Sequence, residues 1–357
     1  MIKENMVKDY VKQIKSVDHM AKRRVMLKEA KSLKISGSLG LLDIIAKQIL
    51  SIKEEINPYN FKKSIVVMAG DHGVAEESIS VFKSSVTGKL LQKIGEGKAP
   101  INAIADTVGA SLVPVDMGVT EIVKSCSTIL NMKLGYATNN IAKGPAMHRE
   151  QVIEGILKGI QLVSSELLIH SDIIAVGEIG IGNTTSASAM TSVLCRMSPE
   201  ETVGQGTGIA LDVQDRKIDI VKRSLLINMA NPDDPIDILT KLGGFEVVGV
   251  VGVILGAAIN KIPVVVDGFI SSVAGLLAYR MSQVVSEYMI ISHLSAEPGH
   301  KYVIQELKKS PLLNLGMRLG QASGAGLTLP LIESACAVYL KSATIRDSEI
   351  KAEDKNI

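Results

Sequence analysis

The chain has no tryptophan and few other aromatic residues, which together make up 3% of its 357 positions. Proteins that bind single-stranded nucleic acid stack the bases on aromatic side chains, so this shortage argues against that role. Its 39 basic and 37 acidic residues leave a net charge of +2, and a basic stripe is not evident. We therefore expect no nucleic acid among the partners.

Cysteine is also scarce. Cys126, Cys195 and Cys336 lie far apart in the chain and share no metal-ligand spacing. We expect free thiols in a reducing cytoplasm, with a redox or metal role as the alternative. The first residues, MIKENMVKDY, are charged from the third position, which is not typical of a secretory signal. These features predict a cytoplasmic protein.

No apolar run is long enough for a clean membrane span. The most apolar stretch, Val247–Ala278, is interrupted by Asn260, Lys261, Pro263 and Asp267. Neither half reaches the ~18 apolar residues that a spanning helix needs. We interpret the stretch as a buried helix followed by a buried strand, and expect no membrane partner.

Short Val- and Ile-rich runs alternate with longer helical stretches from residue 58 onward. The predicted strands are Ile65–Ala69, Leu112–Val115, Ile173–Val176, Ile262–Val266 and Tyr288–Ile291. Continuous apolar strands separated by helices indicate a mostly parallel α/β sheet with helices on both faces. Helical spacing at both chain ends predicts a small helical domain from residues 1–57 and 325–357, beside a large nucleotide-binding domain from 58–324.

Each predicted strand is followed by an ionisable residue. These are Asp71 with His72, Asp116, Glu178, Asp267 and His293. Taken singly, each suits a helix cap or a turn. Because ligands bind at the carboxyl edge of open parallel sheets, the five together predict one shared crevice.

A glycine-rich turn, Gly177–Ser186, follows the third predicted strand and reads GEIGIGNTTS. Its glycines permit close backbone approach, and the helix that follows presents a positive N-terminus to an anion. The spacing matches neither the dinucleotide fingerprint nor a P-loop. The turn predicts a site for a phosphate or carboxylate, with a plain tight turn as the alternative.

Two further glycine clusters lie downstream. Val203–Gly208 is followed by Lys217, which is either a second phosphate contact or an exposed helical lysine. Arg318–Gly326 is either a ligand-facing loop or a set of close-packing positions at a helix start. Both alternatives stay open on sequence alone.

The chain resembles the nicotinate-nucleotide–dimethylbenzimidazole phosphoribosyltransferase family through motifs spread over most of its length. They are AGDHGV, VDMGV, GEIGIGNTTSASA, VGQGTG, LGGFE, IPVVVDGFIS, SAEPGH and LGMRLGQASGAGL, beginning at Ala69, Val115, Gly177, Val203, Leu242, Ile262, Ser295 and Leu315. The resemblance implies transfer of phosphoribose from nicotinate mononucleotide to an aromatic base for cobamide synthesis. It also implies a homodimer, no metal and no cofactor.

The resemblance also implies roles for particular residues. The 5′-phosphate would bind at Gly180, Gly182, Asn183, Thr184, Thr185, Gly206 and Lys217. Asp267 would lie near the ribose. The acceptor base would be approached by Asp71, His72 and the segment up to Leu91, including Phe82 and Leu90.

Two positions depart from the family pattern. Gln321 stands where the family has the glutamate that acts as general base, and an amide has no useful basicity. Glu178 is then the carboxylate left for proton removal.

Phe82 is bulky where the family tends to have a small residue. This difference predicts another acceptor, such as a phenol or purine, or it reflects neutral drift in a loop. The chain is accordingly either an active transferase or a weakly catalytic or non-catalytic subunit that pairs with a catalytic paralogue in a phenol-type heteromeric enzyme.

Overall fold

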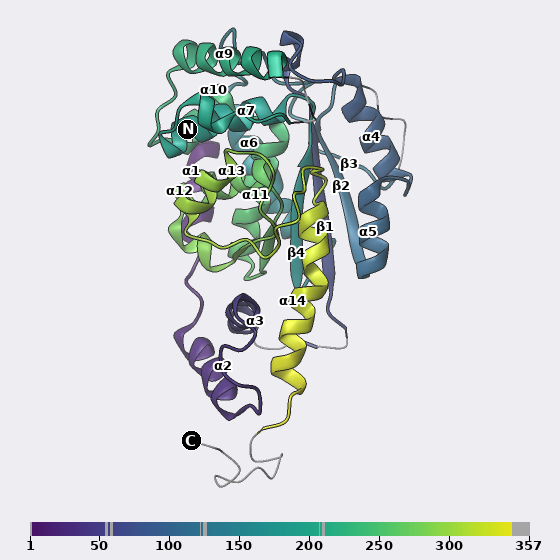
Figure 1. Ribbon diagram of the computed structural model, residues 1–357, viewed down its shortest axis with the longest axis vertical. Coiled ribbons are helices and arrows are strands. Elements are labelled where there is room, and N and C mark those ends of the chain that lie inside the picture. The colour runs from purple at the N-terminus through teal and green to yellow at the C-terminus, as the bar shows by residue number, and fades with distance from the viewer. Residues whose placement is uncertain are drawn as a thin grey trace.

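A computed structural model describes residues 2–53, 56–57, 60–121, 123, 127–206, 208 and 211–344. Its centre is a parallel sheet with the strand order β3-β2-β1-β4-β5-β6 (Figure 1). The strands are β1 (Lys63–Gly70), β2 (Ala110–Gly118), β3 (Leu130–Asn131), β4 (Ile173–Ile179), β5 (Val264–Val266) and β6 (Met289–Ile291). The predicted α/β class and all five predicted strands are confirmed.

The order of the strands reverses beside β1. This strand pairs with β2 on one side and with β4 on the other. The chain that leaves β1 therefore runs away from the chain that leaves β4, and a crevice forms where the two diverge. The ligand-binding edge of this sheet is thus at the ends of β1 and β4.

Alternate residues along each strand face opposite layers of helices. Val66, Met68 and Val176 belong to one apolar cluster, whereas Ile65 and Val67 belong to the other. The first layer contains α1 (Ile2–Lys12), α6 (Arg149–Val163), α7 (Asn183–Cys195), α9 (Leu211–Asn228), α10 (Pro235–Leu242), α11 (Phe245–Ile259), α12 (Phe269–Met281) and α13 (His300–Leu307). The second contains α3 (Leu41–Ile52), α4 (Ser85–Gly95), α5 (Pro100–Val108) and α14 (Ser323–Lys341). Burial on both faces explains why the strands read as unbroken apolar runs.

The remaining helical segments are short or peripheral. They are α2 (His19–Lys31), α8 (Pro199–Thr202), η1 (Gly73–Glu77) and η2 (Gln283–Glu287). The predicted buried helix and strand within Val247–Ala278 are confirmed as α11 and β5. The two-residue β3 escaped prediction because it is too short to carry an apolar pattern.

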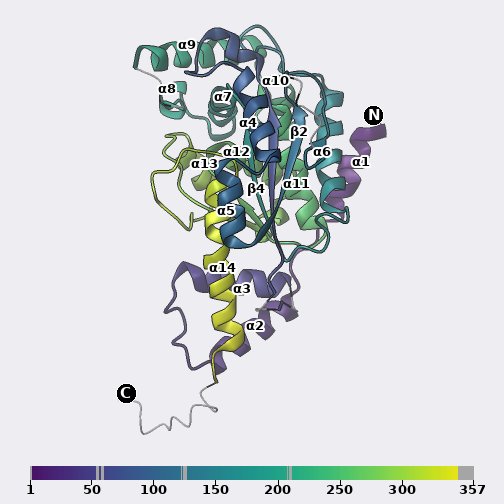
Figure 2. The same ribbon diagram turned by 90° about the vertical axis from the view of Figure 1, so that its right-hand side faces the viewer.

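A helical group lies below the sheet in Figure 1. In it α2 packs on α3, and α3 packs on α14. The predicted small helical domain included residues 1–57 and therefore α1. In the structure α1 instead packs against α6 and α11, which cover the sheet (Figure 2). α14 runs without a break across the predicted boundary between residues 324 and 325.

Within the described residues, α14 is the one helix long and apolar enough to cross a membrane by length and composition. It packs against α3, α5 and β4, and 56% of its most apolar window is buried. Such burial is what the core helix of a globular protein shows.

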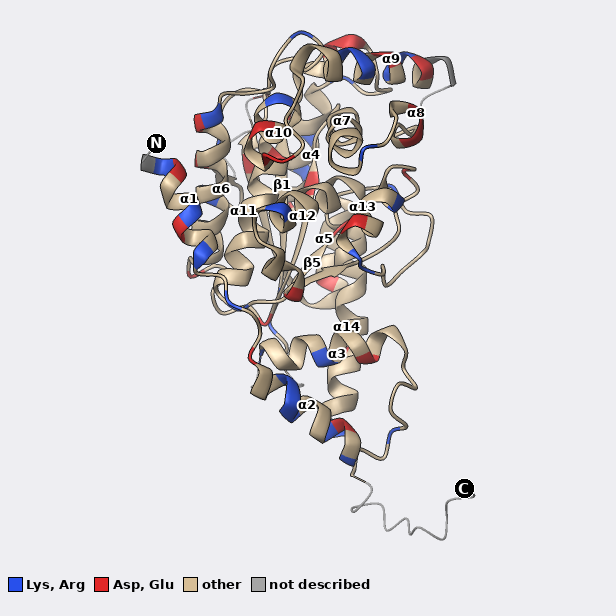
Figure 3. Cartoon of the chain, turned by 90° about the vertical axis from the view of Figure 1, so that its left-hand side faces the viewer, with Lys and Arg blue, Asp and Glu red and all other residues tan. Residues whose placement is uncertain are grey.

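Lys, Arg, Asp and Glu are interspersed on the helices that Figure 3 displays, including α1, α2 and α9.

Candidate functional site

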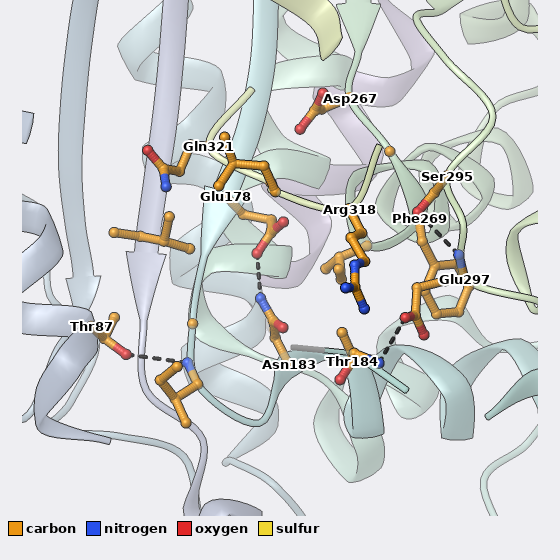
Figure 4. Close-up of a pocket in the computed structure, with 18 of the residues that line it drawn as sticks. Thr87, Glu178, Asn183, Thr184, Asp267, Phe269, Ser295, Glu297, Arg318 and Gln321 are labelled. Atoms are coloured by element: carbon orange, nitrogen blue, oxygen red, sulfur yellow. Dashed lines mark hydrogen bonds between the residues drawn. The ribbon is translucent and has the colours of Figure 1, made fainter. Parts of the chain in front are cut away.

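A cavity of about 430 Å³ lies at the carboxyl edge of the sheet (Figure 4). Its volume is in the range typical of small-molecule sites. Most of the predicted site residues line it: Phe82, Leu90, Glu178, Gly180, Asn183, Thr184, Gly206, Asp267 and Gln321. Its remaining lining includes Thr87, Phe269, His293, Ser295, Glu297 and Arg318.

The N-terminus of α7 forms part of the cavity floor. Gly182 precedes the helix with a φ of 95°, a left-handed conformation that favours glycine. Among the described residues no side chain caps this end of α7, and Asn183 and Thr184 of its first turn line the cavity. The positive end of the helix dipole is therefore free to attract an anion.

Packing explains two glycines of this turn without any ligand. A Cβ on Gly177 would lie 2.2 Å from the amide nitrogen of Ala322, and one on Gly180 would lie 2.4 Å from the carbonyl oxygen of Gly70. Gly177 thus lets the loop before α14 pack on β4. Gly180 lets the turn pack on the end of β1.

Lys217 of α9 lies directly behind the floor. It is 1% exposed, and its Nζ donates hydrogen bonds to Thr184 Oγ1 at 2.8 Å and to the carbonyl oxygen of Gly204 at 3.2 Å. Burial lowers the pKa of Lys217 to about 8, against the opposing charge of Glu297. The alternative that Lys217 is an exposed helical lysine is wrong.

Glu178 projects from β4 into the cavity. Its Oε2 accepts a hydrogen bond from Nδ2 of Asn183. Burial raises the pKa of Glu178 well above its usual range, and the nearby carboxylates Glu246 and Asp267 raise it further. Burial therefore favours the protonated form of this carboxyl group, whereas a nearby positive charge would favour the carboxylate.

Asp267 follows β5 and faces the same space. Its Oδ1 accepts a hydrogen bond from the backbone N–H of Ala325 at 3.0 Å, in the first turn of α14. Burial raises the pKa of Asp267 to about 7, although backbone N–H donors, including that of Ala325, act to lower it. His293 Nδ1 lies 3.7 Å from Asp267 Oδ1, and burial lowers the pKa of His293 to about 4. The imidazole is therefore neutral at physiological pH.

Gln321 lies in the loop that precedes α14. Both it and Ala322 adopt left-handed backbone conformations, with φ values of 60° and 58°. Gln321 is 3% exposed, and its Oε1 has no hydrogen-bond partner among the described residues. An unsatisfied buried acceptor next to a cavity is a candidate for contact with a ligand's N–H group.

Several predicted residues lie outside the lining of the cavity. Asp71 Oδ2 accepts a hydrogen bond from the N–H of Thr120 at 2.8 Å, and His72 Nε2 pairs with Glu246 Oε1 at 2.6 Å. Both predicted residues are buried behind the wall. Gly182, the residue before α7, and Thr185, a buried residue of its first turn, likewise do not line the cavity.

The prediction of one shared crevice is confirmed for the residues that follow β4, β5 and β6. It is wrong for those that follow β1 and β2. Glu178, Asp267 and His293 line it. Asp116 instead accepts hydrogen bonds from the N–H groups of Gly118 and Val119 and pairs with Lys133 at 3.2 Å. β2 lies beyond β1 from the point of reversal, so its polar residue serves its own loop.

Two charged residues of the cavity, Glu297 and Arg318, were not predicted from the sequence. Glu297 accepts a hydrogen bond from the N–H of Gly206 at 2.8 Å, and Arg318 lies close to Thr184 and Glu297 in Figure 4. Glu297 lies in the motif SAEPGH and Arg318 in the motif LGMRLGQASGAGL. Their charges are the feature of the sequence from which a place in the site could have been predicted.

Cys195 and Cys336 do not line the cavity. Burial raises the pKa of Cys195 to about 12 and that of Cys336 to about 12, and both are free thiols. The prediction of free thiols is confirmed for these two, whereas Cys126 lies outside the described residues. Within the described part of the chain, no group of three His, Cys, Asp or Glu residues is placed to hold a metal ion.

The fold and the cavity together define a parallel α/β protein in which a helix N-terminus and buried carboxyl groups line one cavity. The sequence model of a family described as "Phosphoribosyltransferase" matches residues 14–350. The chain belongs to the nicotinate-nucleotide–dimethylbenzimidazole phosphoribosyltransferase family and is a transferase of that type.

Named relatives agree along nearly the full length. The chain is 38% identical over 340 residues to the nicotinate-nucleotide–dimethylbenzimidazole phosphoribosyltransferase of Desulforudis audaxviator, covering 95% of this chain and 96% of the relative. It is 37% identical over 345 residues to the protein of that name from Clostridium acetobutylicum, covering 97% and 98%. The crystal structure of CobT from Thermus thermophilus is similar with a TM-score of 0.88 at 30% identity, covering 93% of this chain and 99% of that one.

Proposed function

We propose that this chain transfers phosphoribose from nicotinate mononucleotide to an aromatic nitrogen base and so makes an α-ribotide for the lower ligand of a cobamide. One observation carries the proposal: a single cavity combines a free helix N-terminus with the buried carboxyl groups of Glu178 and Asp267. This arrangement suits a ligand with an anionic end and a cationic centre.

The anionic end of the ligand is the 5′-phosphate. Asp267 already occupies the start of α14 by accepting the N–H of Ala325. The start of α7 has no such cap, and Lys217 lies behind it. We therefore place the phosphate at Asn183 and Thr184, where the helix dipole and the ammonium group act together.

The cationic centre is the pyridinium ring of nicotinate mononucleotide and the C1′ atom to which it is bonded. C1′ gains positive charge as its bond to the ring breaks. Positive charge next to Glu178 and Asp267 favours their carboxylate forms, in spite of burial. The donor substrate thus creates the negative charge that stabilises its own transition state.

In the bond-making step, a ring nitrogen of the acceptor attacks C1′ from the face opposite the leaving nicotinate. The C1′–N bond breaks, its electron pair stays on the pyridine nitrogen, and the anomeric centre inverts. The attacking nitrogen is the one whose lone pair is free, and the proton of the acceptor's ring N–H group passes to the carboxylate of Glu178. Gln321 positions the acceptor by a hydrogen bond, and Phe82 and Leu90 supply apolar contact for the ring.

The test is an assay of the purified chain with nicotinate mononucleotide and a panel of benzimidazoles, purines and phenols. Release of nicotinate together with an α-ribotide is the expected result. If no acceptor yields a ribotide, the chain is not an active transferase on its own.

The replacement of the usual glutamate by Gln321 favours a second candidate, a weakly catalytic subunit. Such a subunit would retain the phosphate site and need a paralogue that carries the general base. Ribotide formed only after the paralogue is added would support this candidate. Full activity of the chain alone would exclude it.

A further inference from the structure

Glu297 is a buried carboxylate in the cavity wall, between β6 and α13. It is 6% exposed, and its Oε1 accepts the N–H of Gly206 at 2.8 Å. Its Oε2 is buried against Gly204, where a Cβ would lie 2.4 Å away, and has no hydrogen-bond partner among the described residues. A carboxylate in this position requires a nearby positive charge, because burial of an isolated charge is costly.

Lys217 is the ammonium group whose pKa responds to Glu297. The hydrogen-bond acceptors around its Nζ, Thr184 Oγ1 and the carbonyl oxygen of Gly204, are both uncharged. Burial lowers the pKa of Lys217 to about 8, and the negative charge of Glu297 opposes that shift. Both side chains contact the Gly204–Gly206 turn: Glu297 accepts the N–H of Gly206, and Lys217 Nζ donates to the carbonyl oxygen of Gly204 and would lie 3.4 Å from a Cβ on Gly206. Each charge can therefore offset the cost of burying the other.

Other charged groups near Lys217 are differently placed. Arg318 shares this end of the cavity and lies near Gly208. Glu200 of α8 is exposed and pairs with Lys222 at 2.6 Å. α7 presents Thr184, and α10, which also packs on α9, carries Asp237 and Lys241 paired with each other at 3.0 Å.

We propose that Glu297 is a positioning residue for the phosphate site: it holds the amide of Gly206 and keeps Lys217 in the ammonium form. The inference rests on the proposed function, because the ligand that gains from a charged Lys217 is the 5′-phosphate. An uncharged amine at this position would remove a positive charge from the phosphate and leave the Glu297 carboxylate uncompensated.

The test measures the dissociation constant of nicotinate mononucleotide by calorimetry, from about pH 7 to about pH 10. A phosphate monoester is dianionic over this range, since its second pKa is about 6. Affinity of the unmodified chain should fall as the pH rises past about 8, the pKa of Lys217. In Glu297→Gln the amide oxygen still accepts the Gly206 N–H, but the negative charge is gone. The fall should begin at lower pH, with affinity near pH 8 reduced up to about tenfold, equivalent to one pKa unit.

Two comparisons separate this effect from a general disturbance. Glu200→Gln removes an exposed carboxylate from the same region and should leave the pH profile unchanged. Lys217→Arg installs a guanidinium that stays charged over the whole range. In that background, Glu297→Gln should no longer shift the profile, and thermal unfolding checks that every variant is folded.

Three outcomes would overturn the inference. They are an unmodified chain whose affinity does not depend on pH above neutrality, a Glu297→Gln profile that superimposes on that of the unmodified chain, and a shift that persists in the Lys217→Arg background. The first needs no variant. Binding without turnover would contradict the proposed transfer reaction, while the pH dependence would still decide the role of Glu297.

Discussion

The backbone N–H of Gln321 donates a hydrogen bond to the carbonyl oxygen of Glu178 at 2.9 Å. This bond fixes the loop before α14 to the end of β4. Gln321, which by the family resemblance would replace the general base, is thereby held next to Glu178, which we propose takes the proton instead. The chemistry of the two side chains is consequently best tested together.

Gln321→Glu restores a carboxylate beside Glu178, and turnover with benzimidazoles should increase. A general base is typically worth ~10²–10⁴-fold in rate, which sets the upper range of the gain. Steady-state kcat for ribotide formation is the measurement, and Gln305→Glu, at an exposed position of α13, is the matched control. An unchanged kcat would indicate that Glu178 already serves as the base.

Glu178→Gln removes that remaining carboxylate, and kcat should fall by ~10²-fold or more. Because burial raises the pKa of Glu178 well above its usual range, the unmodified enzyme should gain activity as the pH rises toward that pKa. The variant should lack this rise. A variant that keeps the same pH–rate profile would exclude Glu178 as the group that takes the proton.

Asp267→Asn should change the pH dependence of stability. The pKa of Asp267 is about 7 in the folded chain and ~3.9 in an unfolded one. The folded state therefore holds the proton more tightly, so this group's contribution to stability is full below about pH 4 and is lost as the pH rises to about 7. Asparagine cannot ionise, although its Oδ1 still accepts the N–H of Ala325.

Calorimetric unfolding of Asp267→Asn and the unmodified chain at about pH 5 and about pH 8 checks this prediction. At the higher pH the variant should become more stable relative to the unmodified chain. The difference in their free energies of unfolding should change by up to ~1.4 kcal/mol for each pKa unit crossed. Asp106→Asn, at an exposed position, is the control. A difference that stays constant with pH would contradict the prediction.

Gly177→Ala should destabilise the fold. The new Cβ would lie 2.2 Å from the amide nitrogen of Ala322, so the loop before α14 must move. Overpacking of this kind costs ~1–3 kcal/mol. Gly144→Ala, where a Cβ meets no atom within 4 Å, should change stability by less than ~0.5 kcal/mol. Urea denaturation measures both, and equal values would argue against the close contact.

Phe82→Ala should alter the choice of acceptor. Phe82 lines the cavity while remaining 52% exposed, whereas its neighbour Val81 is exposed and does not line it. KM for the acceptor should rise several-fold and bulkier rings should be tolerated, with KM for nicotinate mononucleotide unchanged. Val81→Ala is the matched control. Equal effects of the two substitutions would remove Phe82 from the acceptor site.

The sequence predicted the sheet because burial on both faces leaves a plain signal. Strands such as Ile173–Val176 must be apolar at every position when helices cover both sides. Glu178 and Asp267 were found for a related reason, since an ionisable residue at the end of a buried strand stands out. The carboxyl ends of β4 and β5 then bring both residues to one edge.

The sequence could not rank the strands by position in the sheet. Asp116 follows the same pattern as Asp267, but β2 lies on the far side of β1 from the cavity. The sequence also could not show which way a side chain points. His72 follows a buried strand as predicted, but its imidazole pairs with Glu246 and does not line the cavity. The requirement for Gly177 comes from Ala322, which is distant in sequence and becomes a neighbour only in the folded chain.

The reversal of strand order at β1 and β4 also bears on how such enzymes diversify. Phe82 and Leu90, which meet the acceptor in our proposal, follow β1, whereas the phosphate turn follows β4. In our proposal, the apolar contacts to the acceptor ring and the turn that binds the phosphate are therefore encoded in separate stretches of the gene. Mutations after β1 can therefore reshape the space for the acceptor ring without altering the turn after β4, where we propose that the phosphate binds.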